Sequence, residues 1–319
     1  MAIIKSNILQ AKSFLAQGDL IAIPTETVYG LAGNAYDEAT VLNIFKVKKR
    51  PSFDPLIVHA NTITDIHTFT TDIHPLALKL ANYFWPGPLT LLLKKNKMIP
   101  DIVTSGSPYV GVRIPKHPLT QSLLAVLPFP LAAPSANPFG YISPTKSVHV
   151  HDQLGNKIPY ILDGGNCRVG IESTIVGFDN ECPTIYRLGG ITRCMIEQVI
   201  GPIVVNLQHV PQQPHLPGTL AHHYSPTRKL KIGDIMSLIQ AHQAKTIGIL
   251  SFDHYYPGIE KKRQIILSTS GDLDEAARHL FAALRQLDQM PIDLIVTAYV
   301  PNHGIGVSIN DRLYRASNN

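Results

Sequence analysis

Residues 21–60 read IAIPTETVYGLAGNAYDEATVLNIFKVKKRPSFDPLIVHA, and two kinds of hydrophobic pattern alternate along them. Short apolar runs at 19–24 and 55–60, rich in Ile and Val, are typical of buried strands. Between these runs, apolar residues recur at the spacing of one helix face. The stretch therefore predicts a strand, a helix and a second strand, which suits a mixed α/β domain.

The ends of the predicted helix can be placed from single residues. Asp37 is a suitable N-cap, because its carboxylate can accept hydrogen bonds from the first free amide groups of a helix. Pro51 biases Arg50 toward an extended backbone. We therefore expect the helix to run from Asp37 to about Lys49.

Related patterns continue on both sides of this stretch as far as residue 207. Helices are expected over residues 1–18, where the pattern is amphipathic, and over residues 74–85. Extended segments are expected at 89–95, 109–115, 129–134, 160–165, 173–178 and 184–189. The first part of the chain is thus predicted to be a mixed α/β domain with many strands.

A proline-rich segment, PQQPHLPG at 211–218, interrupts the pattern and favours an extended connector. Beyond it, Ile- and Val-rich runs and one strongly helical segment follow in the order of a small doubly wound sheet, at 245–252, 263–270, 274–290 and 292–300. We therefore predict an N-terminal domain at 1–207, a linker at 208–229 and a smaller C-terminal domain at 230–319.

The composition is that of a globular protein, with 45% hydrophobic and 16% charged residues in 319. No apolar run approaches the roughly 18 residues that a membrane span needs, and residues 1–18 do not resemble a signal peptide. We expect a cytoplasmic protein without a membrane segment. The net charge of +5 permits contact with nucleic acid but does not by itself indicate it.

The spacing of the cysteines and histidines, and the absence of several motifs, argue against some common kinds of site. The three cysteines Cys167, Cys182 and Cys194 show no recurring interval, so neither a disulfide framework nor a four-cysteine zinc site is expected. The histidine pairs at 149 and 151 and at 222 and 223 have no third ligand nearby, so no protein-bound transition metal is expected. A GxSxG elbow, a Rossmann glycine motif and a Walker loop are all absent from the sequence.

A row of hydroxyl groups follows the first buried strand. If the chain stays extended there, Thr25, Thr27 and Tyr29 lie on one face, because side chains alternate along a strand. The alternative is a turn whose threonines bond to nearby backbone groups. The residues themselves leave both open.

Four cations, Lys46, Lys48, Lys49 and Arg50, end the predicted helix, where the helix dipole is negative. A solvated helix end explains most of such a cluster. If the chain leaves the helix at this point, Lys48 and Arg50 could instead converge on one anion, such as a triphosphate.

The segment at 109–115 alternates cleanly, with Tyr109, Gly111 and Arg113 on one face. An arginine beside a glycine suits capture of a carboxylate, although an exposed strand arginine is equally compatible with the pattern. Ser135 and Asn137 follow an apolar run, and Ser173 and Thr174 precede another. Hydroxyls and amides at strand ends are common in ligand sites and in ordinary turns.

Several motifs follow one another along the chain: PTETVYGL, KKRP followed by PLIVH, WPGPLTLLL, VGVRIP, APSAN and STIV. Taken in this order, they resemble the threonylcarbamoyl-AMP synthases, which are YrdC-like enzymes. The runs PGTLAHHYSP and INDRLYRA are similar to the longer, two-domain members of that family. The most specific part is Lys48-x-Arg50 combined with Ser135-x-Asn137. The resemblance implies a YrdC-like twisted mixed sheet in the N-terminal domain and a Rossmann-like, doubly wound C-terminal domain.

The resemblance also implies a nucleotidyltransferase reaction. L-threonine and bicarbonate would give an N-carboxylated threonine, whose new carboxylate attacks the α-phosphorus of ATP and releases pyrophosphate. Mg²⁺ bound with ATP would share the phosphate charge. The product, threonylcarbamoyl-AMP, would pass to a threonylcarbamoyl transferase complex that modifies tRNA, and contact with tRNA or double-stranded RNA is a further expectation.

Roles for single residues follow from the same resemblance. Lys48 and Arg50 would be catalytic. The nucleotide would be bound by Lys48, Arg50, Asp54, Tyr109, Ser135, Asn137, Ser143, Arg187, His223 and Tyr224. Threonine would be bound by Thr27, His59, Arg113, Ala133 and Ser173, with Arg113 holding its carboxylate.

Three of these residues carry further expectations. His223 and Tyr224, in HHYSP, would close over the site, so that the proline-rich connector acts as a lid. Asp54 stands where related sequences often have asparagine, and its charge would repel a triphosphate unless it is paired or bound to Mg²⁺.

Two other functions are compatible with a YrdC-like fold. One is a non-enzymatic RNA-binding module, for which a basic concave surface would suffice. The other is a carbamoyl-transfer protein of hydrogenase maturation, but such proteins carry acylphosphatase and zinc-finger-like regions that this chain does not contain.

Overall fold

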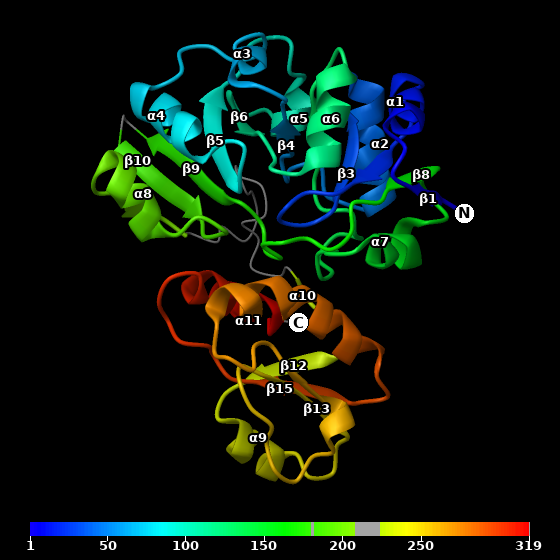
Figure 1. The fold of residues 1–319 in the computed structure, drawn as a ribbon, viewed down its shortest axis with the longest axis vertical. Helices are drawn as coiled ribbons and strands as arrows, with labels where there is room; N and C mark the ends of the chain where they lie inside the picture. Colours follow the sequence, from blue (N-terminus) through cyan, green and yellow to red (C-terminus); the bar gives the residue numbers. More distant parts are fainter. Residues whose placement is uncertain (180–181, 208–223, 319) are drawn as a thin grey trace.

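The computed structural model describes residues 1–179, 182–207 and 224–318, which gather around two β-sheets (Figure 1). The larger sheet belongs to the first two thirds of the chain and the smaller one to the last third. Within these described ranges, no helix is both long enough and apolar enough to cross a bilayer.

The larger sheet has the strand order β1-β8-β2-β3-β7-β4-β6-β5-β9-β10-β11. Parallel and antiparallel pairs are mixed, since β6 runs parallel to β4 and antiparallel to β5. The strands are β1 (Ile3–Lys5), β2 (Ile21–Ile23), β3 (Gly30–Asn34), β4 (Ile57–His59), β5 (Leu89–Lys94), β6 (Tyr109–Arg113), β7 (Leu131–Ala132), β8 (Tyr160–Leu162), β9 (Thr174–Asp179), β10 (Cys182–Arg187) and β11 (Val204–Val205). The mixed α/β class expected from the sequence is confirmed.

Helices cover both faces of this sheet (Figure 1). They are α1 (Ile8–Ala16), α2 (Glu38–Lys48), α3 (Ile63–Ile66), α4 (Pro75–Phe84), α5 (Asp101–Thr104), α6 (Pro118–Val126), α7 (Ser147–Leu154) and α8 (Arg193–Ile200). Alternation along β2 separates the two cores, because Ile21 and Ile23 pack with α1 and α6 whereas Ala22 belongs to the core on the other face.

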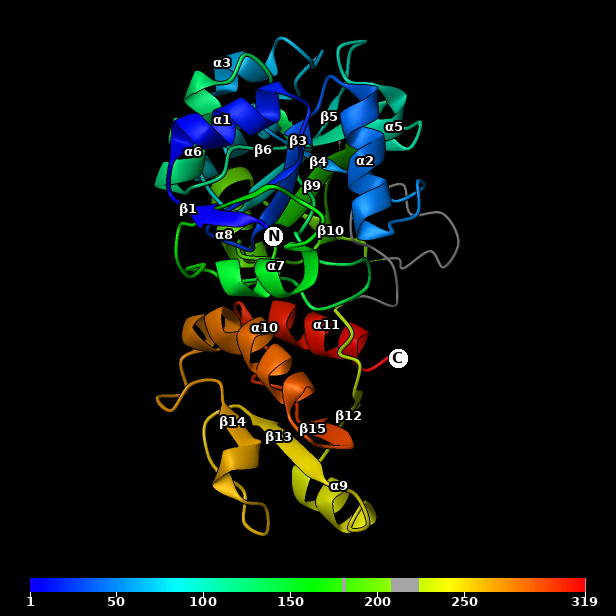
Figure 2. The same cartoon turned by 90° about the vertical axis from the view of Figure 1, so that its right-hand side faces the viewer.

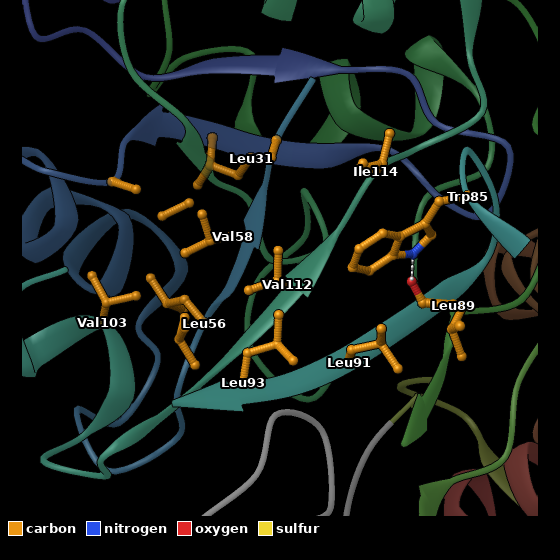
Figure 3. Packing of buried hydrophobic residues seen from close by; sticks show 14 of the residues in the cluster. Leu31, Leu56, Val58, Trp85, Leu89, Leu91, Leu93, Val103, Val112 and Ile114 are labelled. Atoms are coloured by element: carbon orange, nitrogen blue, oxygen red, sulfur yellow. Dashed lines mark hydrogen bonds between the residues drawn. The ribbon is translucent and has the colours of Figure 1, made fainter. Parts of the chain in front are cut away.

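The second of these cores lies beneath the strands that carry the site (Figure 3). Val58 of β4 and Val112 of β6 are fully buried there with Leu91 of β5. The indole Nε1 of Trp85 donates a hydrogen bond of 2.7 Å to the carbonyl of Leu89, so the one tryptophan is buried with its polar atom satisfied. This packing gives β4 and β6 a rigid base.

Helix α2 has the ends that the sequence predicts. The carboxylate of Asp37 accepts hydrogen bonds from the amides of Ala39 and Thr40 at 3.2 Å each. Lys49 closes the helix in the left-handed region, with φ 54°. The chain therefore turns sharply before Arg50.

The N-terminal segment departs from the single helix expected over residues 1–18. Ile3–Lys5 form β1, which pairs with β8 in parallel, and the helix begins only after Asn7. The side chain of Asn7 caps that helix by accepting from the amide of Gln10 at 3.0 Å. Pairing at the sheet edge and a local cap override the amphipathic pattern of these residues.

The smaller sheet is entirely parallel, in the order β12-β15-β13-β14. Its elements are β12 (Lys229–Ile232), α9 (Ile235–Ala241), β13 (Ile247–Ser251), the 3-10 helix η1 (Lys261–Arg263), β14 (Gln264–Ile266), α10 (Leu273–Gln289), β15 (Leu294–Thr297) and α11 (Gly306–Ala316). Helix α9 lies on one face and α10 and α11 on the other (Figures 1 and 2). The doubly wound arrangement expected for this part is confirmed.

Helices α10 and α11 lie between the small sheet and the N-terminal part of the chain (Figure 2). The guanidinium group of Arg285, on α10, donates to the carbonyls of Ile142 and Ser143. On α11, the hydroxyl of Ser308 donates to the carbonyl of Gly189 at 3.0 Å. Buried hydrogen bonds thus join the two parts, in addition to apolar contacts.

The backbone at Gly170 lies close to that of α10, and substitution of this glycine tests the docking. A Cβ at Gly170, where φ is +81°, would lie 2.4 Å from Cα of Arg278 and 2.6 Å from the carbonyl oxygen of Ala277. Gly165 has a similar φ of +77°, but a Cβ there would meet no described atom within 4 Å. Gly165→Ala should cost about 1–2 kcal/mol, the usual penalty of a left-handed alanine. Gly170→Ala should cost clearly more, because it also pushes α10 away.

Thermal unfolding and limited proteolysis of the two variants measure this difference. Faster cleavage between the two parts of the chain is expected for Gly170→Ala alone. Equal behaviour of the two variants would contradict the inferred close packing.

Candidate active site

One pocket gathers most of the polar residues that the sequence singles out. It lies where β4, β6 and β10 meet the segments that follow β2 and β7 and the segment that precedes β9. Its described lining consists of Thr25, Thr27, Val28, Gly30, Arg50, Pro55, Ile57, His59, Arg113, Ala133, Pro134, Ser135, Glu172, Ser173, Arg187 and Tyr224. All of these except Tyr224 come from the N-terminal part.

The segment after β2 is a turn, not an extension of the strand. The Oγ1 atoms of Thr25 and Thr27 lie 2.8 Å apart, and the Thr25 hydroxyl donates to the carbonyl of Val28 at 2.6 Å. The Tyr29 hydroxyl points elsewhere and donates to the carbonyl of Gly165. Of the two alternatives left open by the sequence, the turn is confirmed and the row of three hydroxyls on one face is not formed, because local hydrogen bonds bend the chain.

Arg113 enters the pocket from the end of β6 and is held by several partners. Its Nη2 lies 2.7 Å from Oε1 of Glu26, its Nη1 donates to the Thr27 hydroxyl at 2.8 Å, and its Nε donates to the carbonyl of Gly87 at 3.2 Å. The other Glu26 oxygen accepts from the amide of Lys116 at 2.9 Å. Both charges are buried, so the pair fixes the guanidinium plane in one orientation.

Lys48 does not line the pocket within the described residues. Its Nζ donates to the carbonyl of Asn137 at 2.6 Å and to that of Ser135. Burial and the neighbouring Arg50 lower the pKa of this ammonium well below its usual range. Lys48 thus holds the Ser135–Asn137 turn, while Arg50 lines the pocket, and the convergence of both cations on one anion stays a prediction.

Arg50 does line the pocket, and its own loop orients it. Its Nε donates to the carbonyl of Asp54 at 2.9 Å and its Nη2 to that of Pro55 at 2.8 Å. The same Nη2 lies 2.8 Å from Oδ1 of Asp54, a fully buried carboxylate. Asp54 thus sits behind Arg50 and compensates its charge, instead of facing the pocket as a nucleotide contact would.

The turn after β7 carries Ser135 and Asn137. Ser135 lines the pocket and forms a β-bridge with Gly30. Asn137 is buried, and its Nδ2 donates to the carbonyls of Pro138 and Tyr141 at 2.8 Å each. Asn137 therefore shapes the turn, while Ser135 lines the cavity.

Ser173, directly before β9, and Arg187, at the end of β10, form a second polar wall. The Arg187 Nε donates to the Ser173 carbonyl at 3.0 Å and its Nη2 to the Ser173 hydroxyl at 2.9 Å. That hydroxyl also lies 2.7 Å from Oγ1 of Thr90. Burial lowers the pKa of Arg187 to about 10, so the group stays cationic near neutral pH.

Glu172 is a pocket residue that the motif analysis did not select. Its Oε1 accepts from the hydroxyl of Ser143 at 2.6 Å, and its Oε2 accepts from Nε of Arg312 at 3.1 Å. Ser143 itself is fully buried behind it. Glu172 directly precedes Ser173 in GIESTIV, which was the only signal available in the sequence. Its partner Arg312 comes from α11, far along the chain.

His59 and Ala133 complete the wall on the side of Arg113. His59 is buried, and its Nδ1 has no hydrogen-bond partner among the described residues. Burial and the nearby Arg113 lower the pKa of His59 to about 3, so the imidazole is neutral at physiological pH. Ala133 lies next to Gly30, where an added Cβ would come within 3.2 Å of the alanine methyl.

Tyr109, one of the residues predicted to bind the nucleotide, does not line this pocket. Tyr109 starts β6, about 13 Å along the strand from Arg113 by strand rise, and lines a separate hollow with Lys94 and Phe178. It is 49% exposed there. His223 lies outside the described residues. Tyr224, its neighbour, is fully buried and lines the pocket with a left-handed backbone, φ 65°.

The pocket is therefore cationic and pre-oriented. Arg50, Arg113 and Arg187 line it together. Glu172, which also lines it, is engaged by Arg312, and Glu26, which does not, is engaged by Arg113. Such an arrangement suits a ligand with more than one anionic group. Within the described part of the chain, no group of three His, Cys, Asp or Glu side chains could hold a metal ion.

Comparison with known families assigns both parts of the chain. Residues 13–189 match a family model shared by Sua5, YciO and YrdC, described as telomere recombination, and residues 191–318 match the model of the threonylcarbamoyl-AMP synthase C-terminal domain. The chain is 35% identical to the threonylcarbamoyl-AMP synthase of Pyrococcus abyssi, over 96% of this chain and 93% of that protein. It is 38% identical to the Bacillus subtilis synthase, over 97% and 92% respectively.

Solved structures agree with this assignment. The crystal structure of P. abyssi Sua5 complexed with L-threonine superposes with a TM-score of 0.92 at 35% identity, over 99% of this chain and 98% of that one. The E. coli YciO structure, 21% identical over 59% of this chain with a TM-score of 0.53, shares the fold of the N-terminal part. The two family models, the full-length relatives and the pocket together show that the chain belongs to the threonylcarbamoyl-AMP synthase family, in its two-domain form.

Proposed function

We propose that the chain condenses L-threonine, bicarbonate and ATP to threonylcarbamoyl-AMP and pyrophosphate. The observation that carries this proposal is one pocket in which a fixed arginine, Arg113, faces the same cavity as Arg50 and Arg187. The names of the P. abyssi and B. subtilis relatives, and the L-threonine in the P. abyssi structure, support it. A carboxylate and a polyphosphate are the two anionic groups that the reaction brings together.

Threonine would bind on the Arg113 side. The guanidinium group is already oriented by Glu26, Thr27 and Gly87, and its remaining N–H groups can pair with the α-carboxylate. The neutral His59 has an unpaired Nδ1 that can accept a hydrogen bond from the β-hydroxyl of the amino acid. Ala133 and Gly30 leave room for the methyl group.

The nucleotide would bind on the opposite side, against Arg50, Ser135, Arg187 and Tyr224. Arg50 is suited to the phosphates because Asp54 and two carbonyls hold its guanidinium before any ligand arrives. Lys48 and Asn137 would act indirectly, by fixing the turn after β7. Ser143 would act indirectly too, by holding the carboxylate of Glu172.

The chemistry asks for positioning and not for a covalent intermediate. The carbamate oxygen of N-carboxylated threonine attacks the α-phosphorus, the bond from that phosphorus to the β-phosphate oxygen breaks, and pyrophosphate leaves with the electron pair. A rigid pocket that holds both substrates lowers the entropic barrier, and fixed cations stabilise the charge on the phosphates. Arg50 and Arg187 supply those cations without reorganisation.

Magnesium would enter with the triphosphate. The described residues offer no three-ligand cluster, and the carboxylates of Asp54 and Glu172 are engaged by Arg50 and by Arg312. Mg²⁺ usually keeps several waters and takes its other ligands from substrate phosphates, which fits this pocket. When bound, it would neutralise part of the phosphate charge.

The proposal extends to the setting of the reaction. The product would be handed to a transferase complex that modifies tRNA, in the cytoplasm. The alternative, an RNA-binding module without turnover, would use the basic surface alone. The buried arginines of the pocket favour small anionic substrates over a nucleic-acid backbone, because each is enclosed by the wall of a cavity.

Pyrophosphate release tests the proposed reaction directly. The assay should give product only when ATP, L-threonine and bicarbonate are all present, since the attacking carboxylate forms from two of them. Omission of each component in turn is the measurement. Release that continues without threonine would refute the proposal, and salt-sensitive RNA affinity without any release would favour the RNA-binding module.

The two sides of the pocket should respond differently to substitution. Arg50→Ala should lower kcat/KM for ATP by about 100-fold, the usual effect of removing a group that stabilises transition-state charge. Arg113→Lys should raise KM for threonine by about 10–100-fold, because lysine cannot form the paired hydrogen bonds. Lysine is preferred to alanine at 113 because it leaves a cation beside the buried Glu26.

Steady-state kinetics with each substrate varied in turn provide this comparison. A variant of Arg113 that affects ATP alone, or a variant of Arg50 that affects threonine alone, would overturn the assignment of the two sides.

His59 should determine selectivity for the hydroxyl group. His59→Phe removes the Nδ1 acceptor and keeps an aromatic ring, so the preference for threonine over 2-aminobutyrate should fall by about 10-fold or more. Because the pKa of His59 is about 3, this preference in the parent protein should not change between pH 6 and pH 8. Competition between the two amino acids at several pH values measures both. An unchanged preference in the variant would exclude the proposed hydrogen bond.

A further inference from the structure

We infer that Arg312, on the last helix of the C-terminal domain, is a positioning residue for the nucleotide side of the pocket. The inference rests on the proposed function. Arg312 belongs to the INDRLYRA run and is fully buried, but it does not line the pocket among the described residues. Its influence must therefore pass through the groups it holds.

The first of these groups is Glu172. The carboxylate lines the pocket, and its two oxygens are held from different domains, by the Ser143 hydroxyl at 2.6 Å and by Arg312 Nε at 3.1 Å. Ser143 cannot fix a carboxylate alone, because a single hydrogen bond leaves rotation about it free. Arg312 supplies the second point, so the orientation of Glu172 depends on α11.

The second group is Tyr224, the first residue that the structure describes after residue 207. Its ring stacks on Phe281 of α10 at 5.3 Å between centroids. The guanidinium groups of Arg312 and Arg315 lie over the same ring, at 5.3 Å and 5.9 Å from its centroid. The ring thus contacts one aromatic side chain and two cations, which favours one orientation.

The charges around Arg312 are balanced. Arg312 Nη1 lies 2.7 Å from Asp311, and Arg315 Nη2 lies 3.2 Å from the same carboxylate. With Glu172, the cluster contains two guanidinium groups and two carboxylates. The charge of Arg312 is therefore spent on the carboxylates of Glu172 and Asp311, whereas Arg50 and Arg187 line the pocket themselves.

A purely structural role does not explain this cluster well. Buried ion pairs are costly to desolvate, and apolar replacements of similar size are often neutral for stability. Other contacts already dock the C-terminal domain, such as the hydrogen bond from Ser308 to Gly189 on the same helix and the Arg285 contacts on α10. What Arg312 adds is contact with two pocket residues at once.

Arg312→Met and Arg312→Lys test the inference, with Ser308→Ala as the matched control on α11. For Arg312→Met, kcat/KM for ATP should fall by about 100-fold, as misplacement of binding groups by about 1 Å commonly does. KM for threonine should stay within about twofold of the parent value. The kcat/KM of Arg312→Lys for ATP should lie between those of the parent protein and Arg312→Met. Lysine can pair with Glu172 or Asp311 but cannot hold both in one plane.

Ser308→Ala removes a docking hydrogen bond without touching the cluster, so it should keep the parent kinetics. Binding of a non-hydrolysable ATP analogue, measured by calorimetry, should show the same order of variants without any turnover. Unchanged kinetic parameters for ATP in Arg312→Met would overturn the inference. It would also be overturned if Arg312→Met lost as much activity toward threonine as toward ATP and Ser308→Ala showed the same losses. If Arg312→Met does not fold, the ATP-specific loss in Arg312→Lys decides.

These outcomes are distinct from failure of the proposed function. If the parent protein releases no pyrophosphate with all substrates present, the proposed reaction fails. The analogue-binding comparison still decides whether Arg312 positions the nucleotide side.

Discussion

The buried ion pair between Arg113 and Glu26 fixes the geometry on which the rest of the pocket depends. Arg113 ends a strand whose other face packs into the core, and Glu26 lies in the turn after β2, so the pair joins two distant parts of the sheet. Removing either partner would leave a buried charge uncompensated, which is strongly unfavourable. The turn, the strand end and the cavity between them are therefore set together.

The same rule recurs around the pocket. Arg50 is paired with Asp54 from its own loop, and Arg312 with Glu172 from another domain. Each cation is thus oriented and compensated before a ligand arrives. A site built this way can meet two anionic substrates without rearranging its own charges, which is what an adenylate-forming reaction needs.

Much of the fold could be predicted from local patterns. The α2 helix begins at the Asp37 cap and ends next to Lys49, and the parallel C-terminal sheet follows its Ile- and Val-rich runs. The strand at Ile3–Lys5 could not be predicted, because it exists only through pairing with β8. An edge strand carries no periodic signal when it is only three residues long.

The site was predictable in its membership more than in its geometry. Arg50, Arg113, Ser135 and Arg187 meet as expected, whereas Lys48 binds carbonyls behind the wall and Tyr109 lies at the far end of its strand. Glu26 and Glu172 were missed because acidic residues are not expected beside anionic substrates. Their purpose becomes visible only with the arginines that they hold.

Identification of the reaction product tests the central claim most directly. With ¹³C-bicarbonate, L-threonine and ATP, mass spectrometry should detect an adenylate that contains threonine and one labelled carbon. An unlabelled threonyl adenylate, or the absence of any adenylate while ATP is consumed, would contradict the account.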